Sequence, residues 1–160
     1  MNHEIEEPTL FLLDILDKYD VVSVFYILGL ARDSHYNLYR EIVRRGHLIG
    51  DHGYYHTRGQ NSLDPLFRSP YWDTTPMPWP PSGGFFFRAM PFNYVKWAVE
   101  TSGHFWIHPH DVMLKHPKLT NSTFNWKRHI NLKGARVKLD RLLNEVAFED
   151  PTEFFYASAS

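Results

Sequence analysis

Apolar side chains recur at the spacing of an α-helix in four stretches of the chain. The first stretch carries Glu6 and Glu7 at its start, where negative charge suits the positive end of a helix. The last stretch is the clearest, because its apolar and charged positions fall on opposite faces. The pattern predicts helices over residues 6–19, over residues 34–45 with Asp33 or Ser34 as the cap, from Pro91 onward, and over residues 134–146 with Arg136, Lys138, Asp140 and Arg141 facing outward.

Shorter apolar runs lie between these helices. Residues 21–28 are rich in β-branched and aromatic side chains and are apolar enough to be buried on both faces of a sheet. Residues 47–51 and 104–108 predict two further strands, and residues 82–88 predict a tight glycine turn that enters an apolar strand. Helices that alternate with strands at this spacing predict an α/β fold with a mainly parallel sheet. The proline-rich residues 57–84 lack periodicity and predict a long loop that wraps the site.

Composition narrows the class of protein. The 160 residues predict a single domain over residues 1–160, and a net charge of −1 from 17 basic and 18 acidic residues predicts no nucleic-acid partner. The sequence has no apolar run of the ~18 to 20 residues that a membrane span needs. Residues 1–7 lack the features of a secretion signal, so we expect a cytoplasmic location. Because the chain has no cysteine and ten histidines, we expect any metal to be held by His, Asp or Glu.

The densest group of chemically active side chains lies in residues 46–56. Two histidines of this segment, His52 and His56, are four positions apart. The segment follows a predicted strand and contains Gly53, so we expect a turn after the strand rather than a helix. Two imidazoles at this spacing can reach one cation. In the alternative interpretation, they are polar surface residues of a loop.

Two further groups carry polar chemistry. Arg68, Pro70, Tyr71 and Trp72 make up the first of them. Such a set can form a rigid wall against a sugar ring, or it can be an ordinary packed loop. The second group follows the third predicted strand and consists of His108, His110 and Asp111. The carboxyl ends of parallel strands are where α/β proteins build their sites, so this group is a second candidate.

Together these segments resemble the NodB-type polysaccharide deacetylases, carbohydrate esterase family four. Residues 46–56 match the metal motif of that family, GHEIGxHxxxH, and residues 67–72 resemble its R-x-P-Y motif. Residues 82–91 match a Gly-Gly-aromatic-Arg-x-x-Pro block of one subgroup, and residues 106–111 resemble the late strand that ends in the catalytic histidine. The resemblance implies an incomplete, irregular (β/α) barrel of the polysaccharide deacetylase type.

The resemblance also implies a role for each matched residue. His52 and His56 would be ligands of a divalent metal, most often zinc, and His108 would be the acid that protonates the leaving amine. Arg68 would orient the catalytic carboxylate. The backbone N–H of Tyr71 would stabilise the oxyanion, and Tyr71 and Trp72 would contact the substrate. The implied reaction is metal-dependent hydrolysis of an N-acetyl group on a surface or capsular polysaccharide or its precursor, with release of acetate.

Other interpretations of the same residues stay open. The family has an early strand with two carboxylates, and no such Asp pair precedes the first predicted helix, so we expect a truncated domain. Asp111 is then a candidate for the missing carboxylate ligand. One alternative is a catalytically degenerate carbohydrate-binding protein that stacks sugars on Tyr54, Tyr55, Tyr71, Trp72 and Trp79. Another is a partner protein that forms homo-oligomers through an exposed sheet edge.

Overall fold

The computed structural model describes residues 5–55, 79–115 and 125–157. It divides into two compact units, one formed by Met1–Asn2, Leu16–Thr75 and Phe148–Ser160 and the other by His3–Ile15 and Pro76–Ala147. The first helix, α1 (Glu6–Lys18), spans the boundary between the units. That residues 1–160 form a single domain stays a prediction.

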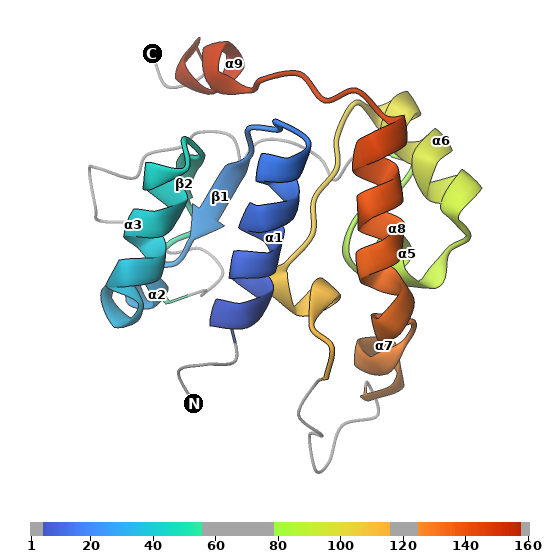
Figure 1. Cartoon of the computed structure of the whole chain (residues 1–160), viewed down its shortest axis with the longest axis horizontal. Coiled ribbons are helices and arrows are strands. Elements are labelled where there is room, and N and C mark those ends of the chain that lie inside the picture. The colour runs from blue at the N-terminus through green and yellow to red at the C-terminus, as the bar shows by residue number, and fades with distance from the viewer. Residues whose placement is uncertain (1–4, 56–78, 116–124, 158–160) are drawn as a thin grey trace. The chain divides into compact units, whose positions relative to one another are not determined.

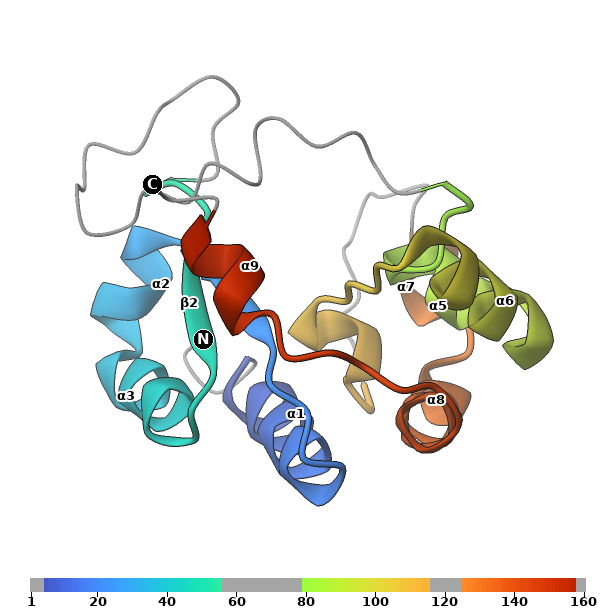
Figure 2. The same ribbon diagram turned by 90° about the horizontal axis from the view of Figure 1, so that it is seen from above.

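The first unit contains a small parallel sheet of two strands. Strand β1 (Val24–Ile27) pairs with β2 (Leu48–Asp51), with Val24 opposite Leu48 and Ile27 opposite Asp51. The helices α2 (Gly29–Ser34) and α3 (Tyr36–Arg44) connect the two strands, and they lie on the same side of the sheet in Figures 1 and 2. The last helix is α9 (Thr152–Ala157). The expected parallel pairing of the first two strands is confirmed, and the described part of the chain shows no barrel.

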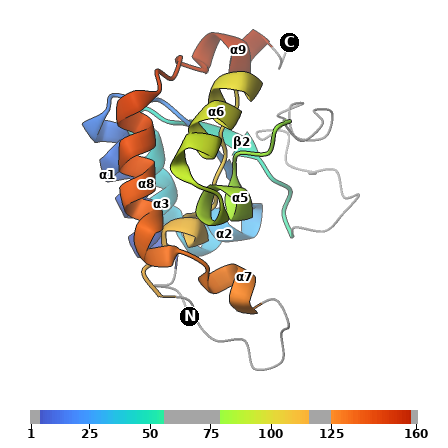
Figure 3. The same ribbon diagram turned by 90° about the vertical axis from the view of Figure 1, so that its right-hand side faces the viewer.

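The second unit is helical and packs around one long helix. Helix α8 (Leu132–Glu145) contacts α5 (Gly84–Ala89), α6 (Phe92–Ser102) and the short 3₁₀ helix η2 (Pro109–Val112), and Figure 3 shows α5 and α6 alongside it. Helix α7 (Asn125–His129) precedes α8. The core of this unit includes Phe87, Val95, Ala98, Val112, Leu139 and Leu142. Complete burial of a side chain as large as Phe87 contributes about 1.5–3 kcal/mol.

Two strand predictions are wrong in this second unit. Residues 84–89 form helix α5 instead of a strand, and residues 104–108 lie in neither a helix nor a strand. The buried residues of α5 are Gly84, Phe87 and Arg88, which is the i, i+3, i+4 spacing of a helix rather than the alternation of a strand. The run of three phenylalanines hides this spacing, because it is apolar at every position.

The helix predicted over residues 34–45 is confirmed as α3, and a separate short helix, α2, precedes it. His35, with a φ of −130° and a ψ of 47°, lies between the two helices. The expected cap is wrong, because the Ser34 hydroxyl donates to the carbonyl of Leu30, one turn back, at 2.8 Å. Asp33 does not cap either helix and forms an ion pair with Arg32. The helices predicted over residues 6–19, from Pro91 and over residues 134–146 are confirmed as α1, α6 and α8.

His47, at the start of β2, is buried beside the ring of Phe25, with 5.2 Å between the ring centroids. Neither of its ring nitrogens has a hydrogen-bond partner among the described residues. Burial lowers the pKa of this imidazole from its ordinary value of 6.5. A buried histidine of this kind is a structural group, and its neutral form is the one that fits the fold.

We expect His47 to make the fold less stable in mild acid. As the pH falls below about 6.5, the unfolded chain takes up a proton that the folded chain binds less readily, so the free energy of unfolding falls by at most about 1.4 kcal/mol per pH unit. In His47→Leu this contribution is absent. Urea unfolding at pH 7.5 and pH 5.5 measures the loss for both proteins. An equal loss in the variant and the parent would contradict the prediction.

Candidate functional site

His52 lies immediately after β2, at the carboxyl edge of the parallel pair. Its backbone N–H donates to the carbonyl of Ile27 at 3.3 Å, which extends the pairing beyond the two strands. The following residue, Gly53, accepts a hydrogen bond from the N–H of Gly29 at 3.0 Å, at the start of α2. These contacts fix the backbone of His52 where parallel sheets commonly build their sites. The side chain is half-buried.

The other residues predicted for the metal and the oxyanion lie outside the described residues. These are His56, Arg68, Tyr71 and Trp72. Of the two histidines in the predicted metal pair, the structure therefore describes only His52. An imidazole nitrogen is a fitting ligand for zinc, so the donor chemistry at the end of β2 suits the expected metal.

The second predicted site residue, His108, lies at the N-terminus of η2 in the second unit. Its side chain is 46% exposed, whereas Asp111, three residues later, is completely buried. The backbone N–H of His108 donates to Oδ2 of Asp111 at 2.8 Å, and Nδ1 of the His108 ring lies 3.5 Å from the same oxygen. Asp111 therefore accepts a hydrogen bond from the backbone of His108 and lies within ion-pair distance of its ring.

Arg88 completes a buried ion pair with Asp111. Its Nε donates to Oδ1 of Asp111 at 2.8 Å, and the side chains of Arg88 and Asp111 are 4% and 0% exposed. Burial opposes the charged form of Asp111, but the hydrogen bonds from His108 and the positive charges of His110 and Arg88 outweigh it and hold the pKa of Asp111 below its ordinary value. The buried carboxylate is thus ionised and shared between Arg88 and His108.

Helix α8 holds the end of α5 that carries Arg88. The side-chain amide of Asn131 donates to the carbonyl of Arg88 at 2.9 Å. The Lys138 ammonium donates to the carbonyls of Phe87 and Met90 at 2.8 and 2.7 Å, where a cation suits the negative end of a helix. Burial lowers the pKa of Lys138. The prediction that Lys138 faces outward is therefore wrong, because its long side chain carries the charge back onto α5.

A pair of glycines sets the distance between α5 and the segment that carries His108. Gly84 donates its N–H to the carbonyl of Trp106 at 3.2 Å, and its φ of 53° is a conformation that side chains rarely adopt. A Cβ at Gly84 would lie 2.9 Å from the Trp106 ring, and a Cβ at Gly83 would overlap the Trp106 carbonyl oxygen. The ring of Trp106 in turn contacts the ring of His108 edge to face, at 5.2 Å between centroids. The glycine pair therefore allows the close approach that places His108.

His108, His110 and Asp111 also form a group that could hold a metal ion, since their ligand atoms all lie within 4.8 Å of one another. The rings of His108 and His110 are stacked, 4.6 Å apart and inclined by only 14°. A metal binds a ring nitrogen in the plane of its ring, and two stacked parallel planes do not meet at a common point. Arg88 also places a positive charge against Oδ1 of Asp111. As arranged, the group suits proton transfer better than metal binding.

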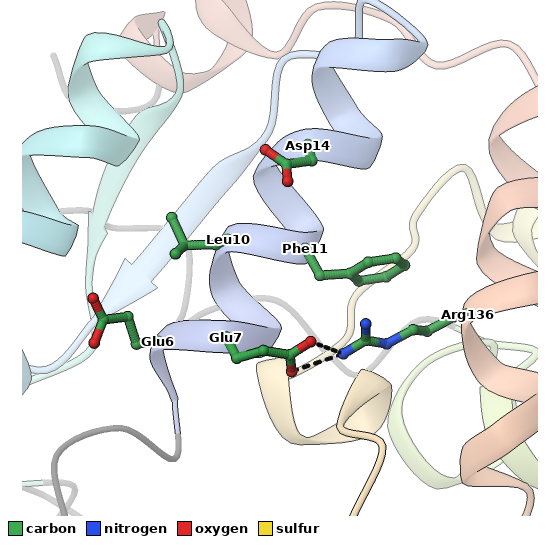
Figure 4. Close-up of a pocket in the computed structure, with 6 residues that line it drawn as sticks. All are labelled: Glu6, Glu7, Leu10, Phe11, Asp14 and Arg136. Carbon is green, nitrogen blue, oxygen red and sulfur yellow. Dashed lines mark hydrogen bonds and ion pairs between the residues drawn. The ribbon is translucent and has the colours of Figure 1, made fainter.

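An open pocket on the second unit is lined by Glu6, Glu7, Leu10, Phe11, Asp14 and Arg136 (Figure 4). Arg136 lies over the ring of Phe11 and binds both carboxylate oxygens of Glu7, at 2.6 and 2.8 Å. Its Nε donates to the carbonyl of Val112 at 2.7 Å, next to Asp111. The prediction that Arg136 faces outward is only partly right, because its side chain is 18% exposed and joins three segments. The pocket contains none of the predicted site residues, and its contacts support the position of η2.

Two family models match the chain. Residues 61–156, more than half of the chain, match the model described as a domain of unknown function, DUF3473, which occurs in polysaccharide deacetylase-like proteins. Residues 6–71 match the model described as polysaccharide deacetylase. These matches define the class of the protein as polysaccharide deacetylase-like. The chain belongs to the NodB-type polysaccharide deacetylases and contains the DUF3473 domain.

No curated protein and no solved structure matches the chain significantly. In the described ranges, no helix is both long enough and apolar enough to cross a lipid bilayer. His52 belongs to the first unit and His108 to the second, so a common site for the two stays a prediction. Arg88 was not among the residues predicted for the site. The available signal was a charged residue directly after an apolar run, which indicates a buried charge when a partner is present.

We expect Arg88→Met to destabilise the protein by about 3–5 kcal/mol, because it leaves the Asp111 carboxylate buried without its partner. The matched control is Arg44→Met, which removes an arginine that is 70% exposed and pairs with Glu41 at the surface, and it should change stability little. Urea unfolding of each variant gives the free energies.

The double variant Arg88→Met/Asp111→Asn provides a second comparison. It removes both charges, so it should be more stable than Arg88→Met alone. Equal losses in Arg88→Met and Arg44→Met, or a double variant no more stable than the single one, would show that the ion pair does not stabilise this unit.

Proposed function

We propose that the protein hydrolyses an N-acetyl group on a surface or capsular polysaccharide or its precursor, in a metal-dependent reaction that releases acetate. Membership of the deacetylase family supports the substrate class and the reaction. The observation that carries the proposal is the accessible imidazole of His108, held by a buried carboxylate that is itself paired with Arg88. A half-exposed imidazole fixed in this way suits proton donation to a leaving group.

His52 and His56 are the proposed ligands of the metal, which is most often zinc in this family. When bound, the ion would supply Lewis acidity toward the N-acetyl carbonyl and toward the attacking water. His52 supports this role by its place at the carboxyl end of β2, with its backbone fixed by Ile27. The chain's own residues then have three tasks, which are to hold the sugar, to stabilise the oxyanion and to protonate the amine.

Each of these tasks has a proposed residue. His108 donates a proton to the amide nitrogen as the C–N bond breaks, so that the amino sugar leaves as a neutral amine. The backbone N–H of Tyr71 stabilises the oxyanion. Arg68 would orient the catalytic carboxylate, the group that this family carries on its early strand. The side chains of Tyr71 and Trp72 pack against the apolar face of the sugar ring.

Association of copies through the edge of the β1–β2 sheet stays a prediction.

A second candidate is a degenerate member of the family that binds carbohydrate without turnover. The observation that favours it is a set of exposed aromatic side chains, of which Trp79 is 84% exposed and Tyr54 and Tyr55 follow β2. Exposed aromatic rings are the usual stacking surfaces for sugars. Metal content separates the two candidates, because an enzyme of this family should hold about one zinc per chain.

We expect His52→Ala to lower the zinc content of the purified protein, because it removes an imidazole ligand. Metal analysis by mass spectrometry, after dialysis against a buffer with trace zinc, measures the ratio of zinc to chain. His104→Ala removes an exposed imidazole at another place and is the control that should keep the parent's ratio. Unchanged zinc in His52→Ala would exclude His52 as a ligand.

We expect His108→Asn to reduce acetate release by about 10²-fold or more while zinc stays bound, because the leaving amine then lacks its proton donor. An enzyme-coupled acetate assay on a panel of N-acetylated oligosaccharides measures turnover, and His104→Asn is the control. Persistent turnover in His108→Asn would show that another group is the acid. If zinc is lost along with activity, His108 is a ligand rather than the acid.

A further inference from the structure

We propose that Asp111 is the positioning residue that orients His108 for proton donation, and that Arg88 holds Asp111 in place. This inference rests on the proposed function, in which His108 is the acid. It adds two residues to which the resemblance gives no role. Neither is expected to touch the substrate, so both would act through the imidazole of His108.

The geometry assigns one oxygen of Asp111 to each partner. Oδ1 accepts the hydrogen bond from Nε of Arg88 at 2.8 Å, and Oδ2 accepts the backbone N–H of His108 at the same distance. Nδ1 of the His108 ring is 3.5 Å from Oδ2. Because one oxygen faces both the backbone and the ring of the same residue, it sets the rotation of the ring. Nδ1 is thereby committed to Asp111, and Nε2 is the nitrogen left for chemistry.

This orientation gives a balanced proton transfer. The imidazolium of His108 has a proton on each nitrogen, and the Nε2 proton moves to the amide nitrogen as the C–N bond breaks. The electron pair of that bond stays on the nitrogen. The oxygen of the attacking water stays on the acetyl carbon, which leaves as acetate, and of the two protons of that water one is released to solvent and the other restores the Nε2 proton of His108. The neutral imidazole keeps its Nδ1 proton, which faces the carboxylate of Asp111. No proton needs to reach Asp111 at any step.

Arg88 is required because a carboxylate with no exposure needs a fixed positive partner. Its own position is set by α8, through the bond from Asn131 to the Arg88 carbonyl and the bonds from Lys138 to the neighbouring carbonyls. A rigid support of this kind is what orients a catalytic side chain to the accuracy that chemistry needs. The buried ion pair therefore transmits the position of α5 to the ring of His108.

The test uses two substrates that differ in their need for an acid. Release of an amine requires a proton, whereas 4-nitrophenolate leaves an acetate ester without one. We expect Asp111→Asn to lower kcat for an N-acetylglucosamine oligomer about 10- to 100-fold with little change in KM, and to change hydrolysis of 4-nitrophenyl acetate less than about 3-fold. An equal loss on both substrates would mean that Asp111 only supports the fold, and would overturn the proposal.

Two further variants test the part played by Arg88. Arg88→Lys keeps the positive charge but loses the planar, forked guanidinium group. It should show the same selective loss of kcat for the amide substrate, to a smaller degree. Adding Arg88→Lys to Asp111→Asn should cause no further loss, because both residues act on one ring. The matched control is Glu145→Gln, which removes a carboxylate paired with Lys96 and Arg141 on α8, and it should leave both substrates unaffected. Additive losses from Arg88→Lys and Asp111→Asn would overturn the coupling.

A measurement without turnover separates failure of this inference from failure of the proposed function. Long-range ¹H–¹⁵N spectra of histidine-labelled protein report which ring nitrogen of neutral His108 carries the proton. We expect the Nδ1–H form in the parent. In Asp111→Asn the negative charge beside Nδ1 is removed, so we expect the preference for the Nδ1–H form to be lost. The same tautomer in both proteins would overturn the inference. If the parent hydrolyses neither substrate but the tautomer changes, the proposed function fails and the positioning role stands.

Discussion

The second unit depends on the buried carboxylate of Asp111. Two segments that are distant in sequence meet at this group. Arg88 brings α5 to it, and Asp111 belongs to η2, whose N-cap residue His108 donates its backbone N–H to the same carboxylate. An ionised group without exposure is tolerated only when charge and hydrogen bonds compensate the lost hydration. The contacts of Asn131 and Lys138 with the end of α5 then follow from the same need, since they fix the helix that carries Arg88.

The buried carboxylate of Asp111, which constrains the fold of this unit, also lies beside His108, the candidate acid. The glycine pair at the start of α5 lets the backbone of Trp106 approach closely, and Trp106 contacts the ring of His108. The polar contacts of Asp111 and the apolar contact of Trp106 thus meet at one half-exposed imidazole, that of His108. A structural ion pair alone would not need to share its carboxylate with an accessible ring. This sharing is the reason to regard the ion pair as part of a site.

Local periodicity was enough to predict α1, α6 and α8, because the buried face of each helix repeats at a constant spacing. The first parallel strand was predicted from its β-branched and aromatic composition. Periodicity failed for residues 82–88, because three successive phenylalanines do not distinguish a buried face from an exposed one. It also failed for residues 104–108, whose backbone bonds to Gly84 rather than to a strand. The residues of the candidate site were likewise predicted only where a local pattern marks them. His52 and His108 were found from motifs, whereas Arg88 and Lys138 were missed because their partners are distant in sequence and long side chains can turn inward.

The sequence hypothesis also offered Asp111 as a carboxylate ligand of the metal, and the geometry weighs against it. A cation bound through Oδ1 of Asp111 would face the guanidinium of Arg88, whose Nε lies 2.8 Å from that oxygen. It would also need two imidazoles to converge, yet the rings of His108 and His110 are inclined by only 14°. The same contacts favour a proton donor, because a carboxylate beside Nδ1 leaves Nε2 for transfer. The ion pair that makes this segment unsuitable for a metal is therefore what makes His108 suitable as an acid.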